Sequence, residues 1–380
     1  MEKKVIIISK FYRESENSRA NLVYKFFKEK GYKAKIICSD FSHSKKIKTN
    51  YKNESNLIII KTQSYKKNIS LERVYSHIKF SFDALNELKK EKCELVYIIL
   101  PPNILGYLIS KYCKKNKIKI ISDVIDLWPE SLPVPKKIKN ILDGSINILW
   151  KKLRVKTLER SDYIITESNY FYDKLKLEKY NNSKVILLKK IIKDEIKKNN
   201  LEKFKIENNI KIVYLGNIGK IYDFKALIEI LKKLSQKVEV LLEIIGIGEE
   251  KDSLIYELDK NQIKYNFYGP IYEEDKKMEI IKKCDFGFNG YKKESEVALS
   301  YKSIDYFSYG IPIINSAKGD TWDMIEKYSV GINYQNIDKK LIENILIYNK
   351  KNNDIIQFFY NKFSYKSLVE DLEEVINCIN

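Results

Sequence analysis

The sequence predicts an α/β fold of two doubly wound domains, and two observations support that prediction. Short β-branched apolar runs alternate with amphipathic, charged stretches from one end of the chain to the other. Continuous apolar strands separated by helices are typical of parallel sheets that are covered on both faces. The chain has 380 residues and is 44% hydrophobic, which suits two domains of ordinary size with a core in each.

The first half of the chain contains a series of candidate strands with helical patterns between them. The expected strands cover residues 5–9, 34–38, 57–60, 96–100, 118–122, 163–166 and 184–188. Regular helical patterns cover residues 18–31 and 71–90. We therefore expect an N-terminal Rossmann-like domain over residues 1–190.

A charged, asparagine-rich stretch at residues 191–210 breaks this rhythm, and we interpret it as a linker. A C-terminal Rossmann-like domain is expected over residues 211–360, and a last helix over residues 361–380 is placed to cross back to the first domain. Its expected strands cover residues 211–216, 238–246, 266–269, 286–290, 311–315 and 331–334. Ligands of such sheets bind at the carboxyl ends of the strands, so we expect a central cleft between the domains.

Composition excludes several classes of protein. Five scattered cysteines without a C-x-x-C pair argue against a disulfide framework and a zinc site, and they favour a reducing compartment. The two histidines, His43 and His77, supply neither a metal centre nor a catalytic triad. The first apolar run is too short for a signal peptide, and prolines interrupt the longest one, at residues 94–110. We expect a cytoplasmic protein that is soluble or lies on a surface.

The net charge of +19 has two explanations that the sequence leaves open. One is a general bias toward Lys, Ile, Asn and Tyr. The other is an anionic partner such as phospholipid, nucleic acid or a phosphorylated substrate.

The stretch ALSYKSIDYFSYGIPIIN, residues 298–315, predicts a helix with a cation and a carboxylate on one face. Ser300 is a suitable N-cap, and Gly310 ends the helix. Lys302 and Asp305 are three residues apart, in the first turns of the helix. A phosphate at the positive helix end followed by ribose hydroxyls fits this spacing. An ordinary ion pair on a solvated helix is the alternative.

A second stretch, KIVYLGNIGKIYDFKALIEIL, indicates a strand, a glycine turn and a helix that begins near Asp223. Gly216 and Gly219 allow close approach of a diphosphate, which Lys220 is able to neutralise. The pattern G-x-G-x-x-G is absent, which disfavours a dinucleotide-dependent dehydrogenase.

A third stretch, IISDVIDLWPESLPVP, follows a strand with Asp123 and Asp126. Either these aspartates are buried structural groups, or Asp126 is a polar partner of a hydroxylic substrate.

Together these residues resemble the retaining glycosyltransferases of family 4, whose GT-B fold consists of two Rossmann-like domains. DVIDLWPESL (123–132), LERSDYIITES (158–168), YLGNIGKIYDFKALI (214–228) and YKSIDYFSYGIPII (301–314) carry the resemblance, and they follow the family's order. The resemblance implies a nucleotide-sugar donor, retention of configuration, and neither a metal nor a cofactor.

The resemblance also implies roles for residues. Lys302 would contact the donor diphosphate, Asp305 the ribose, and Asp126 the reacting sugar and acceptor, so that Asp126, Lys220 and Lys302 form the catalytic set. The implied donor-binding residues are Gly216, Asn217, Gly219, Lys220, Glu296, Lys302 and Asp305.

Three departures from the family pattern affect this assignment. Val297 replaces the expected sugar-binding glutamate, with Glu294 and Glu296 close by. Asn217 replaces an arginine, and Ile125 stands where many relatives have a histidine.

Residues 136–156 carry seven basic residues and one acid, interleaved with apolar side chains. This pattern is typical of an interfacial helix, and a core-packed helix is the alternative. The expected acceptor or membrane contacts are Asp123, Trp128, Trp150, Lys151 and Lys152. Such an interfacial helix would suit an acceptor that is carried on a polyprenyl diphosphate at the inner face of the membrane.

The preferred function is therefore sugar transfer in the synthesis of a capsule, exopolysaccharide or lipopolysaccharide. A nucleotide-sugar epimerase of GT-B fold is the first alternative. A basic nucleic-acid-binding protein is the second, although no nucleic-acid motif is present.

Overall fold

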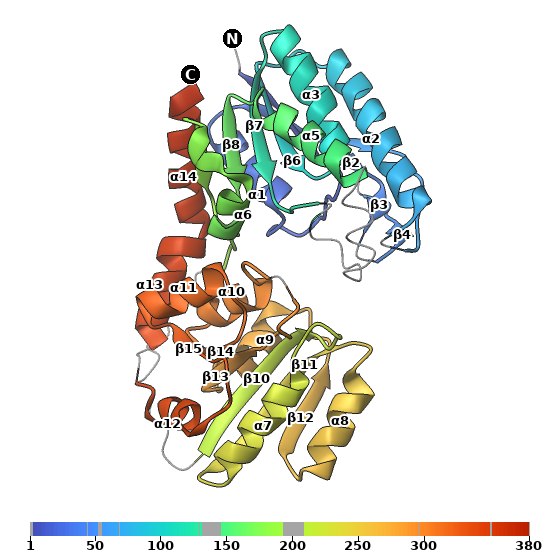
Figure 1. Ribbon diagram of the computed structural model, residues 1–380. Helices are drawn as coiled ribbons and strands as arrows, with labels where there is room; N and C mark the ends of the chain where they lie inside the picture. The colour runs from blue at the N-terminus through green and yellow to red at the C-terminus, as the bar shows by residue number, and fades with distance from the viewer. Residues whose placement is uncertain are drawn as a thin grey trace. The chain divides into compact units, whose positions relative to one another are not determined.

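The computed structural model describes residues 3–43, 45–51, 55–67, 69–128, 130, 146–192, 209–295, 297–349 and 352–379. The chain divides into two compact units (Figure 1). Unit 1 comprises residues 1–191 and 368–380, and unit 2 comprises residues 192–367. Each unit holds one parallel sheet with helices around it, which confirms the expected α/β class.

The sheet of unit 1 is parallel throughout and has the strand order β5-β2-β1-β6-β7-β8-β9. Its strands are β1 (Lys4–Ser9), β2 (Lys33–Ser39), β5 (Leu57–Ile60), β6 (Leu95–Leu100), β7 (Lys119–Val124), β8 (Tyr163–Thr166) and β9 (Ser183–Val185). All lie where the sequence predicts them, although β9 is shorter than expected. A small antiparallel ribbon of β3 (Phe41–Ser42) and β4 (Ile47–Lys48) was not predicted.

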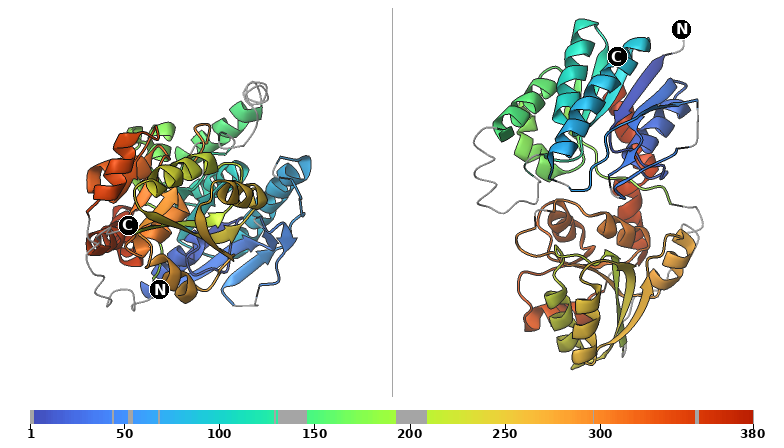
Figure 2. Two further views of the ribbon diagram at one scale, coloured as in Figure 1. Left: turned by 90° about the horizontal axis from the view of Figure 1, so that it is seen from below. Right: turned by 90° about the vertical axis from the view of Figure 1, so that its right-hand side faces the viewer.

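Helices cover both faces of this sheet (Figure 2). They are α1 (Arg19–Glu29), α2 (Leu71–Lys90), α3 (Asn103–Lys115), α5 (Ile146–Leu158), α6 (Asn169–Leu175) and the short 3-10 helix η1 (Leu177–Lys179). The C-terminal helix α14 (Tyr365–Ile379) packs against unit 1, where Asp371 pairs with Lys184 at 3.0 Å and with Lys189 at 2.9 Å.

The sheet of unit 2 is also parallel, with the strand order β12-β11-β10-β13-β14-β15. Its strands are β10 (Asn209–Asn217), β11 (Glu239–Ile247), β12 (Lys264–Gly269), β13 (Phe286–Asn289), β14 (Ile313–Asn315) and β15 (Gly331–Asn333). Its helices are α7 (Phe224–Ser235), α8 (Lys251–Lys260), α9 (Glu274–Ile281), α10 (Tyr301–Ser308), α11 (Asp320–Tyr328), α12 (Lys339–Ile347) and α13 (Asn352–Phe363). Asp223 caps α7 through the amide of Ala226, which confirms the helix start predicted there.

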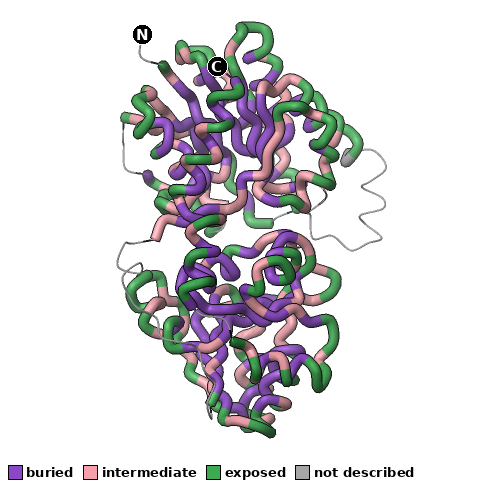
Figure 3. The backbone as a smooth tube through the Cα atoms, turned by 90° about the vertical axis from the view of Figure 1, so that its left-hand side faces the viewer, coloured by how far each residue is buried: buried purple, intermediate pink, exposed green. Residues whose placement is uncertain are grey.

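The order of strands reverses once in each sheet, and this reversal positions the candidate sites. In unit 1 the reversal lies between β1 and β6, and in unit 2 it lies between β10 and β13. The central strands are buried along nearly their whole length, as the purple tube in Figure 3 shows. In doubly wound sheets, ligands bind beyond the carboxyl ends of the strands at such a reversal.

Candidate functional site

Helix α10 begins and ends as the sequence predicts. The Ser300 hydroxyl accepts a hydrogen bond from the Ser303 amide at 3.3 Å and so caps the helix. Gly310 follows the helix with φ of +74°, a left-handed conformation that glycine adopts at low cost. The capped start places Lys302 in the first turn, close to the end of β10.

Lys302 is enclosed by three tyrosine rings. Its Nζ lies 3.5 Å from the ring centroid of Tyr222, 4.5 Å from that of Tyr214 and 5.1 Å from that of Tyr291. The ammonium also donates to the Tyr214 hydroxyl at 3.5 Å, and the side chain is only 7% exposed. Burial lowers the pKa of Lys302 well below its ordinary value. The sequence left open an ordinary ion pair between Lys302 and Asp305 on a solvated helix. Because Lys302 is buried and Asp305 is half-buried, the helix does not present such a solvated pair.

The tyrosines come from both sides of the strand reversal. Tyr214 lies on β10, Tyr222 lies between β10 and α7, and Tyr291 follows β13. Tyr222 and Tyr291 form an isolated antiparallel bridge, and their rings lie 5.0 Å apart. Three stretches of sequence thus bring their rings around Lys302, and we call Tyr214, Tyr222 and Tyr291 the tyrosine box.

Glycines shape the loop that follows β10. A Cβ on Gly246 would lie 1.8 Å from the carbonyl oxygen of Gly216, and a Cβ on Gly248 would lie 2.2 Å from that of Ile218. The backbones after β10 and β11 therefore touch directly. The close approach of a diphosphate that we predicted from Gly216 and Gly219 stays a prediction, since these contacts involve Gly246 and Gly248.

A ladder of asparagine side chains holds the neighbouring strand ends. Asn289 donates to Asn315 at 2.7 Å, and Asn315 donates to Asn333 at 2.8 Å. The Ser300 hydroxyl joins the ladder by donating to Asn289 at 2.8 Å. Sequence reasoning missed this ladder, although each of the expected strands 286–290, 311–315 and 331–334 contains an asparagine, which the structure places at the last position of β13, β14 and β15.

The other residues predicted to bind the nucleotide-sugar donor are not brought together in the tyrosine box. Asn217 is exposed, and its side chain lies over Gly219, where a Cβ would be 2.4 Å from the asparagine Nδ2. Lys220 is exposed on the same loop and pairs with Glu249 at 3.3 Å. Glu296 lies outside the described residues.

Asp123 in unit 1 requires a correction. We expected it to contact the acceptor, but its side chain is fully buried and both oxygens are engaged. Arg19 donates from Nε at 2.7 Å and from a terminal nitrogen at 3.3 Å, and the Tyr97 hydroxyl donates at 2.6 Å. The side chain thus anchors β7 to α1 and β6, which is the structural alternative for this aspartate.

Asp126, in contrast, is half-buried beyond the end of β7. Its negative charge opposes the lowering of the pKa of Arg73 that burial causes. The neighbouring Trp128 packs on His77, with ring centroids 5.3 Å apart. The resemblance placed Ile125 where many relatives have a histidine, and the structure brings His77 of α2 beside Trp128 of this segment.

The membrane-facing expectation also changes. Trp150 is buried, with its ring centroid 5.5 Å from that of Trp128, so it is not an interfacial anchor. Lys151 is half-buried and Lys152 is exposed. The exposed apolar side chains of α5 are instead those of Ile148, Leu149 and Val155. The first part of the predicted interfacial stretch, residues 136–145, lies outside the described residues. Among the helices that the structure describes, none has the length and apolar content needed to cross a membrane.

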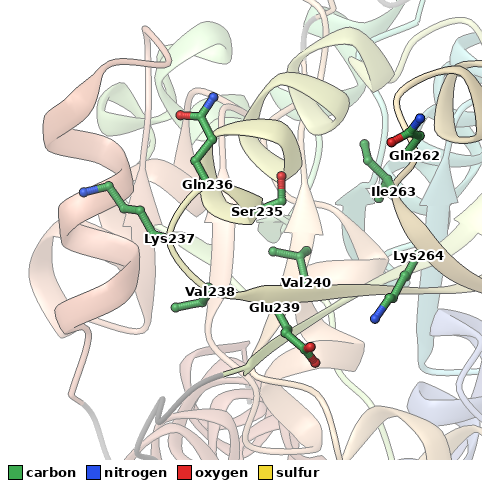
Figure 4. Close-up of a pocket in the computed structure, with 9 residues that line it drawn as sticks. All are labelled: Ser235, Gln236, Lys237, Val238, Glu239, Val240, Gln262, Ile263 and Lys264. Atoms are coloured by element: carbon green, nitrogen blue, oxygen red, sulfur yellow. The ribbon is translucent and has the colours of Figure 1, made fainter.

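A hollow in unit 2 lies away from these residues (Figure 4). It has a volume of about 630 Å³ and is lined by residues 235–240 and 262–264, which lead into the amino ends of β11 and β12. Ligands of doubly wound sheets bind at the opposite, carboxyl ends. We therefore place the candidate site at the tyrosine box and not in this hollow.

Comparisons with known proteins bear on the family and the fold. Residues 195–362 match the sequence model of the family described as glycosyl transferases group 1. No curated protein sequence matches the chain. The matched segment contains the tyrosine box and the glycine loop.

Several solved structures have the same fold over nearly the whole chain. HepE from Anabaena, solved in complex with UDP, has a TM-score of 0.66 at 11% identity, with 99% of each chain covered. The lipopolysaccharide outer core galactosyltransferase WaaB has a TM-score of 0.65 at 16% identity, covering 98% of this chain and 99% of its own. A Listeria monocytogenes protein proposed to be a UDP-N-acetylglucosamine 2-epimerase has a TM-score of 0.60 at 11% identity, covering 99% of this chain and 96% of its own. The chain therefore has the GT-B fold.

Proposed function

We propose that this protein is a glycosyltransferase that moves a sugar from a nucleotide-sugar donor to a glycan acceptor with retention of configuration. The observation that carries the proposal is the match of residues 195–362 to the glycosyl transferases group 1 family, since that segment holds the tyrosine box. The full-length likeness to HepE, which was solved with UDP, is consistent with a nucleoside diphosphate as the leaving group.

In this proposal the donor diphosphate lies between the glycine loop and the start of α10. Lys302 binds its oxygens, and the positive N-terminal end of α10 adds a favourable interaction with the negative charge. During the reaction the bond from the anomeric carbon to the diphosphate breaks while a bond to the acceptor oxygen forms, and the acceptor proton is released. Lys302 stabilises the negative charge that develops on the departing diphosphate. Asp305 accepts hydrogen bonds from the ribose hydroxyls, and Lys220 adds a second, exposed cation.

Donor binding is the direct test of this proposal. Thermal shift with a panel of nucleoside diphosphates and nucleotide sugars should show a rise in melting temperature for one base, because a ligand that binds only the folded state stabilises it. UDP is the first candidate, from the likeness to HepE. If no nucleotide in the panel stabilises the protein, the proposed function is wrong.

Asp126 is proposed to face the reacting sugar and acceptor. Asp126→Asn should lower turnover by about 100-fold, within the range for a positioned acid–base group, while donor affinity stays unchanged. A normal turnover number would remove Asp126 from the reaction. A large loss of donor affinity would place it in the donor site.

An epimerase that acts on the nucleotide sugar itself is the second candidate, because one structure of the same fold is proposed to have that activity. The two functions differ in their products. A transferase releases nucleoside diphosphate only when an acceptor is present, whereas an epimerase changes the sugar without any acceptor. Chromatography of the nucleotide products with and without acceptor distinguishes them.

A lipid-linked acceptor at an anionic membrane surface is the proposal for the second substrate. Exposed Ile148, Leu149 and Val155 of α5 accompany the exposed Lys152 and Lys156, a combination suited to a lipid interface. Sedimentation with liposomes of phosphatidylglycerol should retain the protein at low salt, and neutral phosphatidylcholine should not. Equal partitioning onto both lipids would contradict this part of the proposal.

A further inference from the structure

A second buried lysine lies at the strand reversal of unit 1. Lys10 directly follows β1 and is 1% exposed. Its Nζ donates to the Ser76 hydroxyl at 3.0 Å and to the Ser76 carbonyl at 3.3 Å, and it lies 5.1 Å from the ring centroid of Phe80. These partners are neutral, so hydrogen bonds and a ring face surround the amine.

Further cations converge on the same place. Arg73, one turn before Ser76 on α2, is 7% exposed, and its guanidinium lies 5.2 Å from the Trp128 ring. Lys46 lies with its Nζ 3.2 Å from the His43 Nδ1 and 5.0 Å from the Tyr65 ring centroid. The unit 1 cation cluster is our name for these cations together with the side chains around them, namely Lys10, Lys46, Arg73, His43, His77, Asp126 and Trp128.

Two carboxylates of the described residues lie near the cations of the cluster. Asp40 and Asp126 are the carboxylates whose charges favour the cationic forms of Lys10 and Arg73. Asp40 itself accepts from Lys48 at 2.8 Å. Among the described residues, Lys10, Lys46 and Arg73 therefore lie near the partly buried Asp126 and the Lys48–Asp40 pair.

The pKa values of Lys10 and the two histidines are lowered by burial and by the neighbouring positive charges. Burial, followed by the charge of Arg73, lowers the pKa of Lys10 to about 7. Burial, followed by the charges of Lys46, Arg73, Arg13 and Lys10, lowers the pKa of His43 to about 4. The pKa of His77 falls for the same reasons.

Two buried side chains in the cluster have ring nitrogens that no described residue pairs with. His77 is fully buried, and neither of its ring nitrogens has a hydrogen-bond partner among the residues that the structure describes. The same holds for Nε1 of Trp128, which lies against the His77 ring. Leaving buried donors unpaired is costly, and a bound oxyanion would use them.

We propose that the unit 1 cation cluster is a subsite for a phosphate-bearing group of the second substrate, the sugar acceptor. This inference rests on the proposed function. Lys10 and Arg73 supply the charge, and the ring N–H groups of His77 and Trp128 supply further donors. The half-buried His43, Lys46 and Asp126 form the solvent-accessible side of the cluster. The position beyond β1, at the strand reversal, is where a doubly wound sheet binds ligands.

The two histidines give a direct readout, since they are the only ones in the chain and both belong to the cluster. Protein with isotope-labelled histidine is titrated with inorganic pyrophosphate and followed by NMR. The Lys302→Met background is used, so that binding at the donor site does not compete. A bound anion favours imidazolium, so the pKa of His43 should rise from about 4 to above about 5. Unchanged histidine signals would overturn the proposal.

Variants identify the cations that carry the binding. Lys10→Met and Arg73→Met should each weaken pyrophosphate binding about tenfold or more, as expected for a lost charged hydrogen bond. Lys89→Met is the matched control, because this exposed lysine lies on the same helix, about 24 Å from Arg73 along its axis. Lys10→Met keeps the volume and removes a buried charge, so it tests the proposal even if Arg73→Met fails to fold. Equal affinity in all three variants would overturn the assignment.

Two further arms separate the sources of phosphate and the underlying function. Glucose 1-phosphate represents a soluble acceptor, and phosphatidylcholine vesicles that contain polyprenyl phosphate represent a lipid-linked one. A response to either supports the subsite and identifies its source, whereas an equal response to glucuronate would reject phosphate selectivity. Donor binding by Lys10→Met with Lys302 intact is measured in parallel. If donor binds and the histidines do not respond to any phosphate, this inference fails while the proposed function stands.

Discussion

Two buried cations, one in each unit, are accommodated in opposite ways. Arg19 in unit 1 is matched by Asp123, which it contacts at 2.7 Å and 3.3 Å. Lys302 in unit 2 has a hydroxyl and three ring faces around it, and burial alone shifts its pKa. The first charge is fully compensated inside the protein and therefore serves structure. Among the residues that the structure describes, no carboxylate pairs with the second, so a bound anion would meet a buried amine without a counter-charge.

The largest expected effect tests the compensated pair. Asp123→Asn should lower the free energy of unfolding by about 3–5 kcal/mol, because the buried Arg19 charge loses its partner. Urea denaturation measures the loss. Asp83→Asn is the control, since Asp83 pairs with Lys79 on an exposed helix face and should cost less than about 1 kcal/mol. Similar losses in the two variants would mean that the buried pair is not the structural anchor we describe.

The same comparison predicts the reverse for Lys302. Lys302→Met should leave the free energy of unfolding unchanged or raise it, since a buried amine gives way to an apolar chain of similar volume. It should weaken nucleoside diphosphate binding by about 10- to 100-fold, through the loss of a charge-assisted hydrogen bond. Calorimetry measures the affinity, and Lys339→Met, at an exposed pair with Glu343, is the control. Unchanged affinity in Lys302→Met would remove this lysine from the donor site.

The sequence predicts those features of the buried cations whose signals are local. It does not predict the features that depend on residues far away in the sequence. The strand pattern, the Ser300 cap and the Gly310 stop are local signals, and they predict α10 correctly. The burial of Lys302 is not local, because it needs Tyr214 and Tyr222, about eighty residues earlier on the chain.

The two aspartates of the DVID segment show the same limit. Both belong to one short stretch of sequence. Asp123 still lies within β7, and it contacts Arg19, which is 104 residues away in the sequence. Asp126 lies beyond the strand end and stays half-buried. Spacing within the motif does not separate the two roles, since the partner that decides them belongs to α1.

Lys10 extends the comparison to a third buried cation, and pH is the variable that tests it. Its pKa is about 7 in the folded protein and near 10.5 when exposed, so between these values the unfolded chain binds the extra proton. The free energy of unfolding should therefore rise with pH across this window, by up to about 1.4 kcal/mol per pH unit from this group. Urea denaturation at pH 7.5 and 9.5 gives the free energy of unfolding of the wild type and of Lys10→Met. The difference between the two proteins at each pH isolates the contribution of Lys10, since the other titrating groups are the same in both. A difference that does not change with pH would mean that Lys10 keeps its proton when folded.

The smallest effect concerns the tyrosine box itself. Tyr222→Leu removes the ring nearest the Lys302 amine, whereas Tyr222→Phe keeps the ring and loses only the hydroxyl. A cation–π contact acts on the charged amine, and the pKa of Lys302 is lowered, so the charged form is favoured at low pH. The loss of unfolding free energy in Tyr222→Leu relative to Tyr222→Phe should then be about 0.5–1 kcal/mol larger at pH 5.5 than at pH 9. The cavity left by leucine contributes equally at both pH values and so cancels in this comparison. A pH-independent difference would show that the ring merely fills space, and that the lysine is enclosed by packing alone.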